Sequence, residues 1–266
     1  RNGELNGYRY QDKMLLGHAP QPQFWRAPTD NDFGNRMGIL CNVWRTAGQN
    51  KEFKSMNVER KDGAVTLTSI YYLRDVASDY TVKYTVYADG RVEVNGSWKA
   101  GNIALPEIPR FGMQMTLAQE FDQFSWYGRG PWENYSDRNT ASFIGKYTST
   151  VDEQYVAYIR PQENGNKTDV RWLTLTNKEG FGLRIDGLQP LSVSALRNYP
   201  EDFDAGLTKS QRHINDINPR KAVVLHVDLA QRGVGGDNSW GMYPHEPYLL
   251  KAKEYTYGYV ISPVAK

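Results

Sequence analysis

Runs of β-branched and aromatic residues, separated by short turns, are the main pattern in this 266-residue sequence. Such runs are typical of strands that bury one or both faces. No long segment shows the apolar spacing of an amphipathic helix. One short helix is expected near 208–214. We expect strands at 65–73, 79–87, 91–98, 110–117, 121–127, 169–176, 182–186, 191–195, 223–230 and 253–261.

Turn signals connect these strands into antiparallel neighbours. Asp89 and Gly90 separate two of the runs, and Asp-Gly between two strands is a strong hairpin signal. Many short strands at fairly even spacing predict an all-β fold of stacked antiparallel sheets. Without a repeat, a low-complexity stretch or a linker, residues 1–266 are expected to form a single compact domain.

Three stretches, 18–50, 128–168 and 233–247, interrupt the strand pattern. They contain many Pro, Gly, Asn, Asp and Trp residues and show little alternation. We therefore expect long irregular loops, which is where binding and catalytic residues concentrate on a β scaffold.

Charge and cysteine content exclude several classes of function. The 32 basic and 30 acidic residues give a net charge of +2 without a dense basic cluster, so neither nucleic acid nor a membrane surface is an expected partner. No apolar run approaches the roughly 20 residues that span a bilayer. Cys41 is the single cysteine, so an internal disulfide is excluded.

The N-terminus gives no targeting information. The sequence starts at Arg1 without an initiator Met or a signal peptide, and we expect the chain to be part of a longer protein. Its compartment stays unknown on this basis; a soluble protein of the cytoplasm or the periplasm fits equally well.

The first candidate motif is Phe-Trp-Arg-Ala-Pro-Thr-Asp-Asn-Asp at 24–32. Asp30 and Asp32 suggest a calcium loop, but Arg36 and Cys41 occupy positions where such a loop needs Gly or oxygen ligands. The four histidines are far apart and form no metal-binding pair. We interpret the motif as a structural loop and predict no metal site.

The second and third motifs, at 126–138 and 160–167, contain charges, amides and aromatic residues that suit either loop fixation or a sugar site. We favour loop fixation for the second. In the third, Glu163 could be imagined as a general base. A glycosidase needs two carboxylates about 5 to 10 Å apart, and no such pair can be chosen among 30 acids. Glu163 is therefore interpreted as a hydrogen-bonding strut.

The fourth motif is Gly-Val-Gly-Gly-Asp-Asn-Ser-Trp at 233–240. Its glycines lack the Gly-Lys-Ser/Thr that would make a phosphate loop. They more plausibly allow a sharp turn that displays Asp237, Asn238 and Trp240. Core anchor and ligand contact are equally good interpretations of this Trp.

These four motifs, in this order, resemble the C-terminal small-chain domain of glycoside hydrolase family 2 β-galactosidases. The signatures are Trp-Arg-Ala-Pro-Thr-Asp-Asn-Asp at 25–32, Tyr-Gly-Arg-Gly-Pro-x-Glu-Asn-Tyr-x-Asp-Arg at 127–138, Pro-Gln-Glu-Asn-Gly at 161–165 and Gly-x-Gly-Gly-Asp-x-Ser-Trp at 233–240. The resemblance covers essentially the whole chain. It implies an antiparallel β supersandwich related to galactose mutarotase.

The resemblance also implies which domain carries out the chemistry and which one only contacts the substrate. In the family, terminal β-D-galactose is cleaved with retention by two glutamates of a central barrel that is absent here, and Mg²⁺ and Na⁺ are bound mainly by that barrel. No catalytic residue, metal or cofactor is then expected in this chain. Trp240 is expected to reach the galactose pocket, with Asp237, Asn238 and Ser239 positioning it. The expected partners are the remaining domains of the same β-galactosidase and the galactoside.

Two alternatives have to be distinguished from this role. A free-standing mutarotase-like protein would need a His and a Glu facing one another, and His213 with Glu163 is no more than a guess. A galactoside-binding module would bind sugar weakly without chemistry.

Overall fold

The computed structural model of the protein describes residues 2–207, 212–238 and 240–265. All strand pairs between its elements are antiparallel, which confirms the all-β antiparallel class. The strands are β1 (Tyr8–Tyr10), β2 (Lys13–Leu16), β3 (His18–Gln23), β4 (Lys51–Lys61), β5 (Ala64–Leu73), β6 (Ser78–Val86), β7 (Val92–Lys99), β8 (Arg110–Ala118), β9 (Gln123–Gly130), β10 (Phe143–Thr150), β11 (Lys167–Thr176), β12 (Gly182–Leu196), β13 (Ala222–Gln231) and β14 (Glu254–Val264).

Helical segments are short. The α-helices are α1 (Asp30–Gly34), α2 (Met37–Leu40) and α3 (Pro200–Phe203), and 3₁₀ turns occur at Asn42–Trp44, Arg74–Val76, Asp152–Gln154, Ile214–Asp216 and Glu246–Tyr248. Within the described ranges, none of these helices has the length and apolar character needed to cross a membrane.

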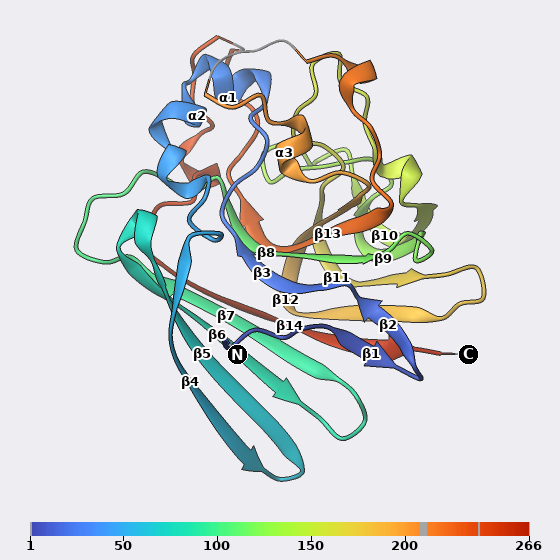
Figure 1. The fold of residues 1–266 in the computed structure, drawn as a ribbon. Helices are drawn as coiled ribbons and strands as arrows, with labels where there is room; N and C mark the ends of the chain where they lie inside the picture. The colour runs from blue at the N-terminus through green and yellow to red at the C-terminus, as the bar shows by residue number, and fades with distance from the viewer. Residues whose placement is uncertain (1, 208–211, 239, 266) are drawn as a thin grey trace.

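The large sheet forks at β12. One edge of β12 pairs with β11, which continues to β9 and β10. On its other edge, residues 182–187 pair with β14 and residues 192–196 pair with β13. One branch therefore runs β13-β8-β3 and the other β14-β7-β6-β5-β4, and the two branches lie over one another as layers (Figure 1).

The core fills the space between these layers. Tyr257 of β14 donates a hydrogen bond of 3.0 Å to the carbonyl of Val227 in β13. The Phe111 ring of β8 lies 5.7 Å from the Tyr257 ring. Burying large aromatic side chains from both layers stabilises such a sandwich.

The predicted strands are confirmed, with one correction. The runs at 182–186 and 191–195 are parts of the single strand β12, because its register shift lets the backbone change partners without ending the strand. The Asp89-Gly90 hairpin is confirmed between β6 and β7, and Gly90 adopts the left-handed φ of 88° that favours glycine.

The predicted irregular loops need a second correction. The stretch 18–50 contains β3 together with α1 and α2, and the stretch 128–168 contains β10. Strands β1, β2 and β4 were also not predicted from the hydrophobic pattern. The helix expected at 208–214 falls mainly on residues 208–211, which lie outside the described residues. In the described part of that range, residues 212 and 213 are not helical and a 3₁₀ turn begins at Ile214 (Ile214–Asp216).

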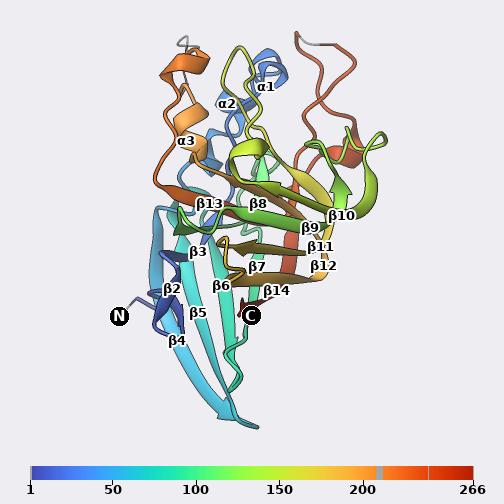
Figure 2. The same cartoon turned by 90° about the vertical axis from the view of Figure 1, so that its right-hand side faces the viewer.

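Most of the irregular segments gather at one end of the molecule. The three α-helices and the long loops lie there, whereas the β4–β5 hairpin reaches the opposite end (Figures 1 and 2). The end with the helices and loops contains all four sequence motifs, and we call it the loop end.

Candidate functional site

A buried group of charges joins the first motif to the fourth at the loop end. Asp32 accepts hydrogen bonds from Arg26 at 2.9 Å and from Arg232 at 2.7 Å, and these three side chains are at most 1% exposed. Arg26 also donates to the carbonyl oxygen of Gly233 at 2.9 Å. Charge pairing offsets part of the cost of burying these ions, and the start of the fourth motif is thereby fixed.

Asp32 also caps the start of helix α1. The Thr29 side chain accepts a hydrogen bond from the Asp32 amide, and the Asp32 carboxylate accepts one from the Thr29 amide. This is a capping box, which satisfies amides at a helix start. The Asp32 oxygens thus bond to arginines and a backbone amide, which supports the interpretation of this motif as a structural loop.

Asp137 of the second motif holds the glycine turn of the fourth. Its carboxylate accepts hydrogen bonds from the Val234 amide at 3.1 Å and the Gly235 amide at 2.7 Å. A Cβ at Gly233 would lie only 2.5 Å from the Asp137 Oδ2 atom. Glycine is required there because the backbone approaches the carboxylate so closely.

Two asparagine side chains, one within the first motif and one just after it, also hold this loop. Asn31 donates to the Val234 carbonyl at 2.9 Å, and Asn35 donates to the Met242 carbonyl at 3.4 Å. The loop 233–247 is thus irregular but fixed near its base by groups from two other motifs.

At the tip of this loop, Trp240 is 80% exposed. Its backbone amide donates a hydrogen bond of 3.1 Å to Asn238, which also accepts from the Met242 amide. Asp237 pairs with His245 at 2.8 Å. Ser239, expected beside them, lies outside the described residues. Trp240 is therefore not a core anchor, and a large exposed aromatic on a fixed loop is typical of a contact site.

The second and third motifs also bind each other. Glu133 accepts a hydrogen bond from the Gly165 amide at 2.8 Å and pairs with Arg138 at 2.5 Å. Arg129 instead pairs with Asp169 at 2.5 Å, outside its own motif. The Asn134 side-chain oxygen accepts from the Thr168 amide at 2.8 Å. These bonds agree with the interpretation that loop fixation is the main role of the second motif.

Glu163 of the third motif acts as a strut. It is buried and accepts hydrogen bonds from Arg110 at 2.8 Å and from Gln231 at 3.1 Å. Its imagined partner His213 has an exposed side chain beside Asp216. Glu163 thus belongs to a buried network, whereas His213 lies on an exposed turn.

Arg110 pairs with a second carboxylate that the sequence did not indicate. Asp228 is fully buried, and its Oδ2 atom lies 3.1 Å from Arg110 Nε. Burial raises the pKa of Asp228 to about 8, against the effect of Arg110, and Glu163 adds to the rise. Near it, burial lowers the pKa of His226 well below its usual range. A carboxyl without solvent contact cannot reach a glycosidic bond, so this network is structural in the present conformation.

The sequence contains a weak signal for His226 and Asp228. Strand β13 places His226 and Asp228 within an apolar run that is buried on both faces. Polar residues in such a run need partners, and these partners come from strands and loops distant in sequence.

A family model described as beta galactosidase small chain matches residues 1–261. A β-galactosidase of Priestia megaterium is 38% identical over 265 residues, which are 99% of this chain and 25% of that protein. A β-galactosidase of Halalkalibacterium halodurans is 32% identical over 95% of this chain and 25% of that protein. The chain spans about a quarter of the length of these curated relatives.

Solved structures give more distant similarities. A glycoside hydrolase family 97 enzyme from a Pseudoalteromonas strain matches with a TM-score of 0.46 and 10% identity, over 96% of this chain and 31% of that one. A GalM/aldose epimerase homologue from C. elegans matches with a TM-score of 0.39 and 12% identity, over 80% of this chain and 70% of that one.

Proposed function

Because this chain belongs to the β-galactosidase small-chain family, we propose that it is the non-catalytic C-terminal domain of a β-galactosidase. In this role the residues that hydrolyse terminal β-D-galactose lie in other domains of the same protein. The present chain completes the galactose pocket and supports the catalytic barrel. The observation that carries this proposal is the exposed Trp240 on a loop whose base is held by three side chains from two other motifs.

The chemistry of Trp240 suits a galactose contact. An indole ring offers a flat apolar face to the C–H groups of a sugar, and its loss of conformational freedom on binding is small. Because the loop base is held by Asp137, Arg26 and Asn31, this part of the loop is ordered before the sugar arrives. Such preorganisation reduces the entropic cost of binding.

The buried acids argue against hydrolysis by this chain alone. A retaining glycosidase uses two carboxylates about 5 Å apart, both facing the sugar. Glu163 and Asp228 instead face Arg110 inside the fold. We propose that the acid/base and nucleophile glutamates are supplied by the barrel.

Exposed apolar side chains support a docking role. Trp132 is 75% exposed, Phe143 75% and Ile159 85%. Phe143 pairs with Gly130, two residues before Trp132, and Tyr158 next to Ile159 hydrogen-bonds to Glu133. Large exposed apolar groups near one another mark interaction surfaces. We propose that these side chains pack against the remaining domains.

The metal ions of the family are assigned to the barrel as part of the same proposal. Among the described residues no group of three or more His, Cys, Asp or Glu side chains is arranged to hold a metal ion. The acidic pair of the first motif does not fit one either, since Asp32 faces Arg26 and Arg232.

Hydrolysis and mutarotation assays test this proposal. The purified chain is expected to release no nitrophenol from a nitrophenyl β-galactoside, whereas the longer protein that contains it releases nitrophenol. Polarimetry with α-D-galactose tests the mutarotase alternative, and the expected rate equals that of buffer. Turnover by the chain after removal of contaminating enzyme would refute the non-catalytic role.

A further inference from the structure

Strand β10 forms one free edge of the large sheet (Figure 2). It pairs with β9 in an unbroken register from Phe143 to Thr150, and no strand of the described ranges pairs with its other edge. A free edge presents backbone N–H and C=O groups to which another extended segment can bond. Which residues of β10 present these groups follows from the contacts at the end of the strand.

The contacts of Thr150 show which way the backbone faces there. The Thr150 amide donates to the Glu153 carboxylate at 2.8 Å, and the Thr150 carbonyl accepts from the Gln154 side chain at 3.3 Å. The next amide, that of Val151, donates to the Asp122 carbonyl just before β9. The backbone of Thr150 therefore faces away from β9, and that of Val151 faces towards it.

The outward backbone groups of β10 are those of Ile144, Lys146 and Thr148. Backbone direction alternates along a strand of an antiparallel pair, so every second residue before Thr150 faces the same way as Thr150. The side chains of these three residues are exposed. The side chains that bond to Thr150 close the edge at that point, so the part that stays available is 144–148, which we call the open edge.

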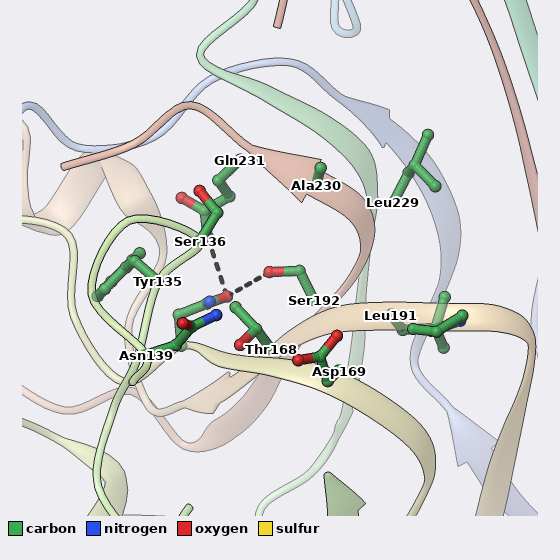
Figure 3. A pocket seen from close by; sticks show the side chains of 12 residues that line it. Tyr135, Ser136, Asn139, Thr168, Asp169, Leu191, Ser192, Leu229, Ala230 and Gln231 are labelled. Carbon is green, nitrogen blue, oxygen red and sulfur yellow. Dashed lines mark hydrogen bonds between the residues drawn. The ribbon is translucent and has the colours of Figure 1, made fainter. Parts of the chain in front are cut away.

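The polar groups of the open edge differ from those of the cavity between β11, β12 and β13 (Figure 3). In that cavity the Asn166 side chain bonds to Ser192 at 2.9 Å and to Gln231 at 3.1 Å, so the fold itself supplies these partners. Among the described residues, no strand supplies partners for the outward backbone groups of the open edge. A further segment can therefore bond to this edge without displacing a strand of the fold.

The open edge lacks the features that protect the other two free edges of this sheet. Strand β4 has six charged residues among eleven and a register shift, and β3 contains two prolines. Charges, prolines and bulges on an edge strand discourage other chains from pairing with it. Strand β10 has one charged residue, Lys146, and neither a proline nor a register shift. Its edge is therefore suited to pair with a further strand.

The open edge adjoins side chains of the proposed docking surface. Phe143, 75% exposed, is the first residue of β10, and Trp132, also 75% exposed, follows β9, the strand that pairs with β10. Ile144 on the open edge is itself 44% exposed. The chain spans about a quarter of the length of its curated relatives, so most of a protein of that length lies outside the matched part and can supply a segment to this surface.

Charges around Lys146 favour an acidic residue in the added strand. Arg129 on the neighbouring strand pairs with Asp169, whereas Lys146 forms no ion pair with a residue of the described ranges. The Arg171 guanidinium lies 5.7 Å from the ring of Tyr127, the residue opposite Lys146 in β9. Two copies that paired about Lys146 would place two lysines opposite one another, and like charges in that position destabilise a sheet, whereas opposite charges stabilise it.

We propose that the open edge of β10 binds an extended segment from another part of the same longer protein, which adds a strand to the sheet and carries an acidic residue opposite Lys146. Main-chain hydrogen bonds supply the affinity of such strand addition, and the side chains supply its selectivity. This inference rests on the proposed function, because it specifies how the surface around Trp132 and Phe143 meets the remaining domains.

Hydrogen exchange resolved to single amides by fragmentation mass spectrometry tests this pairing. In the chain alone, the amides of Ile144, Lys146 and Thr148 should exchange nearly as fast as unprotected amides. In the longer protein that contains the chain, they should exchange at least about a hundredfold more slowly, because a strand hydrogen bond must open first. The outer-edge amides of β4 are the control, and they should exchange equally fast in both.

Three results would overturn the inference in different ways. Fast exchange at the open edge in the longer protein, together with protection of the Trp132 side chain from oxidation, leaves docking in place but excludes strand addition. Fast exchange without protection of Trp132 excludes both. Slow exchange in the chain alone that depends on its concentration means that a second copy occupies the edge. The non-catalytic role is decided separately, by the hydrolysis assay.

Lys146→Pro and Lys146→Met separate the backbone contribution from that of the charge. Proline removes an outward amide that β9 does not use, so the melting temperature of the chain alone should stay nearly unchanged. In the longer protein, Lys146→Pro should restore fast exchange at Ile144 and Thr148. Lys146→Met keeps the amide and should speed this exchange by only about twofold to fivefold, as expected for one lost charge pair.

Gly145→Pro is the matched control, because it removes an amide that faces β9 and should lower the melting temperature of the chain alone. If Lys146→Pro destabilises the chain as much as Gly145→Pro does, the direction assigned to the backbone of β10 is wrong and the inference fails. Unchanged slow exchange in the longer protein with Lys146→Pro would overturn strand addition at this edge. Unchanged exchange with Lys146→Met would overturn the acidic partner residue.

Discussion

Asp137 accepts a hydrogen bond of 2.7 Å from the backbone amide of Gly235, although 98 residues separate them in sequence. The same carboxylate also accepts from the Val234 amide. A single side chain thus fixes the turn from which the Trp240 loop departs. Hydrogen bonds to a charged acceptor contribute about 1.5 to 3 kcal/mol each.

Asp137→Ala should therefore loosen the loop more than it destabilises the sheet. We expect faster hydrogen exchange at the Val234 and Gly235 amides, with the exchange of core strand amides nearly unchanged. Asp137→Asn keeps one acceptor oxygen and should give an intermediate effect. Exchange rates equal to those of the wild type in both variants would show that Asp137 does not hold the loop.

A separate prediction concerns the Trp240 ring in the longer protein that contains this chain. Because the side chain is 80% exposed, Trp240→Ala should leave the melting temperature unchanged. It should raise the KM for a galactoside about tenfold or more, as loss of an aromatic contact of 1.4 kcal/mol or more would. Met56→Ala is the control, because Met56 is 47% exposed on β4 and lies outside the four motifs and the proposed docking surface, and this substitution should leave the KM unaltered. Equal effects of the two substitutions would contradict a specific role for Trp240.

The buried charges of Arg26, Asp32 and Arg232 should be essential for folding. Asp32→Ala leaves two buried arginines without their carboxylate, and we expect a loss of about 3 to 5 kcal/mol in the free energy of unfolding. Urea denaturation measures this loss. Asp79→Ala is the control, because the Asp79 pair with Lys54 is about half exposed and such pairs contribute about 1 kcal/mol or less. A loss at Asp32 no larger than at Asp79 would refute the prediction.

Asp228 should make the free energy of unfolding fall as pH rises, which is the reverse of the usual effect of an aspartate. Its pKa is raised to about 8 in the folded protein, whereas an aspartate in an unfolded chain has a pKa of about 3.9. Between these values the folded state binds the additional proton, so the free energy of unfolding falls as pH rises. His226 acts oppositely because its folded pKa is lowered, so its contribution to stability is lost as pH falls.

Comparison with Asp228→Asn isolates this effect. Urea denaturation between about pH 5 and pH 8 should show a steeper fall in stability for the wild type than for the variant, since His226 contributes to both. Parallel stability curves would mean that Asp228 titrates at the same pH in the folded and unfolded chain.

Three of the strands that escaped prediction from the hydrophobic pattern lie at edges of the large sheet. Each of β3, β4 and β10 pairs with a single neighbour there. Edge strands commonly carry charged and exposed residues that discourage association with other chains, and exposed residues weaken the apolar alternation of β4 and β10. Strand β4 illustrates this, since nine of its eleven residues are exposed. Strand β3 is mostly buried, and its two prolines hide it from a strand pattern instead.

The residues of the candidate site likewise fall into a group that the sequence predicted and a group that it did not. The glycines at 233–236 predict a loop that displays Asp237, Asn238 and Trp240, and the resemblance to the family then singles out Trp240. The network of Arg110, Glu163 and Asp228 joins residues that are up to 118 positions apart (228 minus 110). The closeness of such residues is decided by strand pairing, and single-sequence patterns do not determine which distant strands pair.

The forked strand β12 decides whether the two layers can fold independently of one another. Since one continuous strand supplies an edge to both branches, a break within it would expose hydrogen-bonding groups in each layer at the same moment. Neither layer is then an autonomous folding unit, and the chain should melt in one cooperative transition. A circular permutant opened at the β4–β5 turn should retain that single transition, whereas one opened within residues 187–191 should lose it.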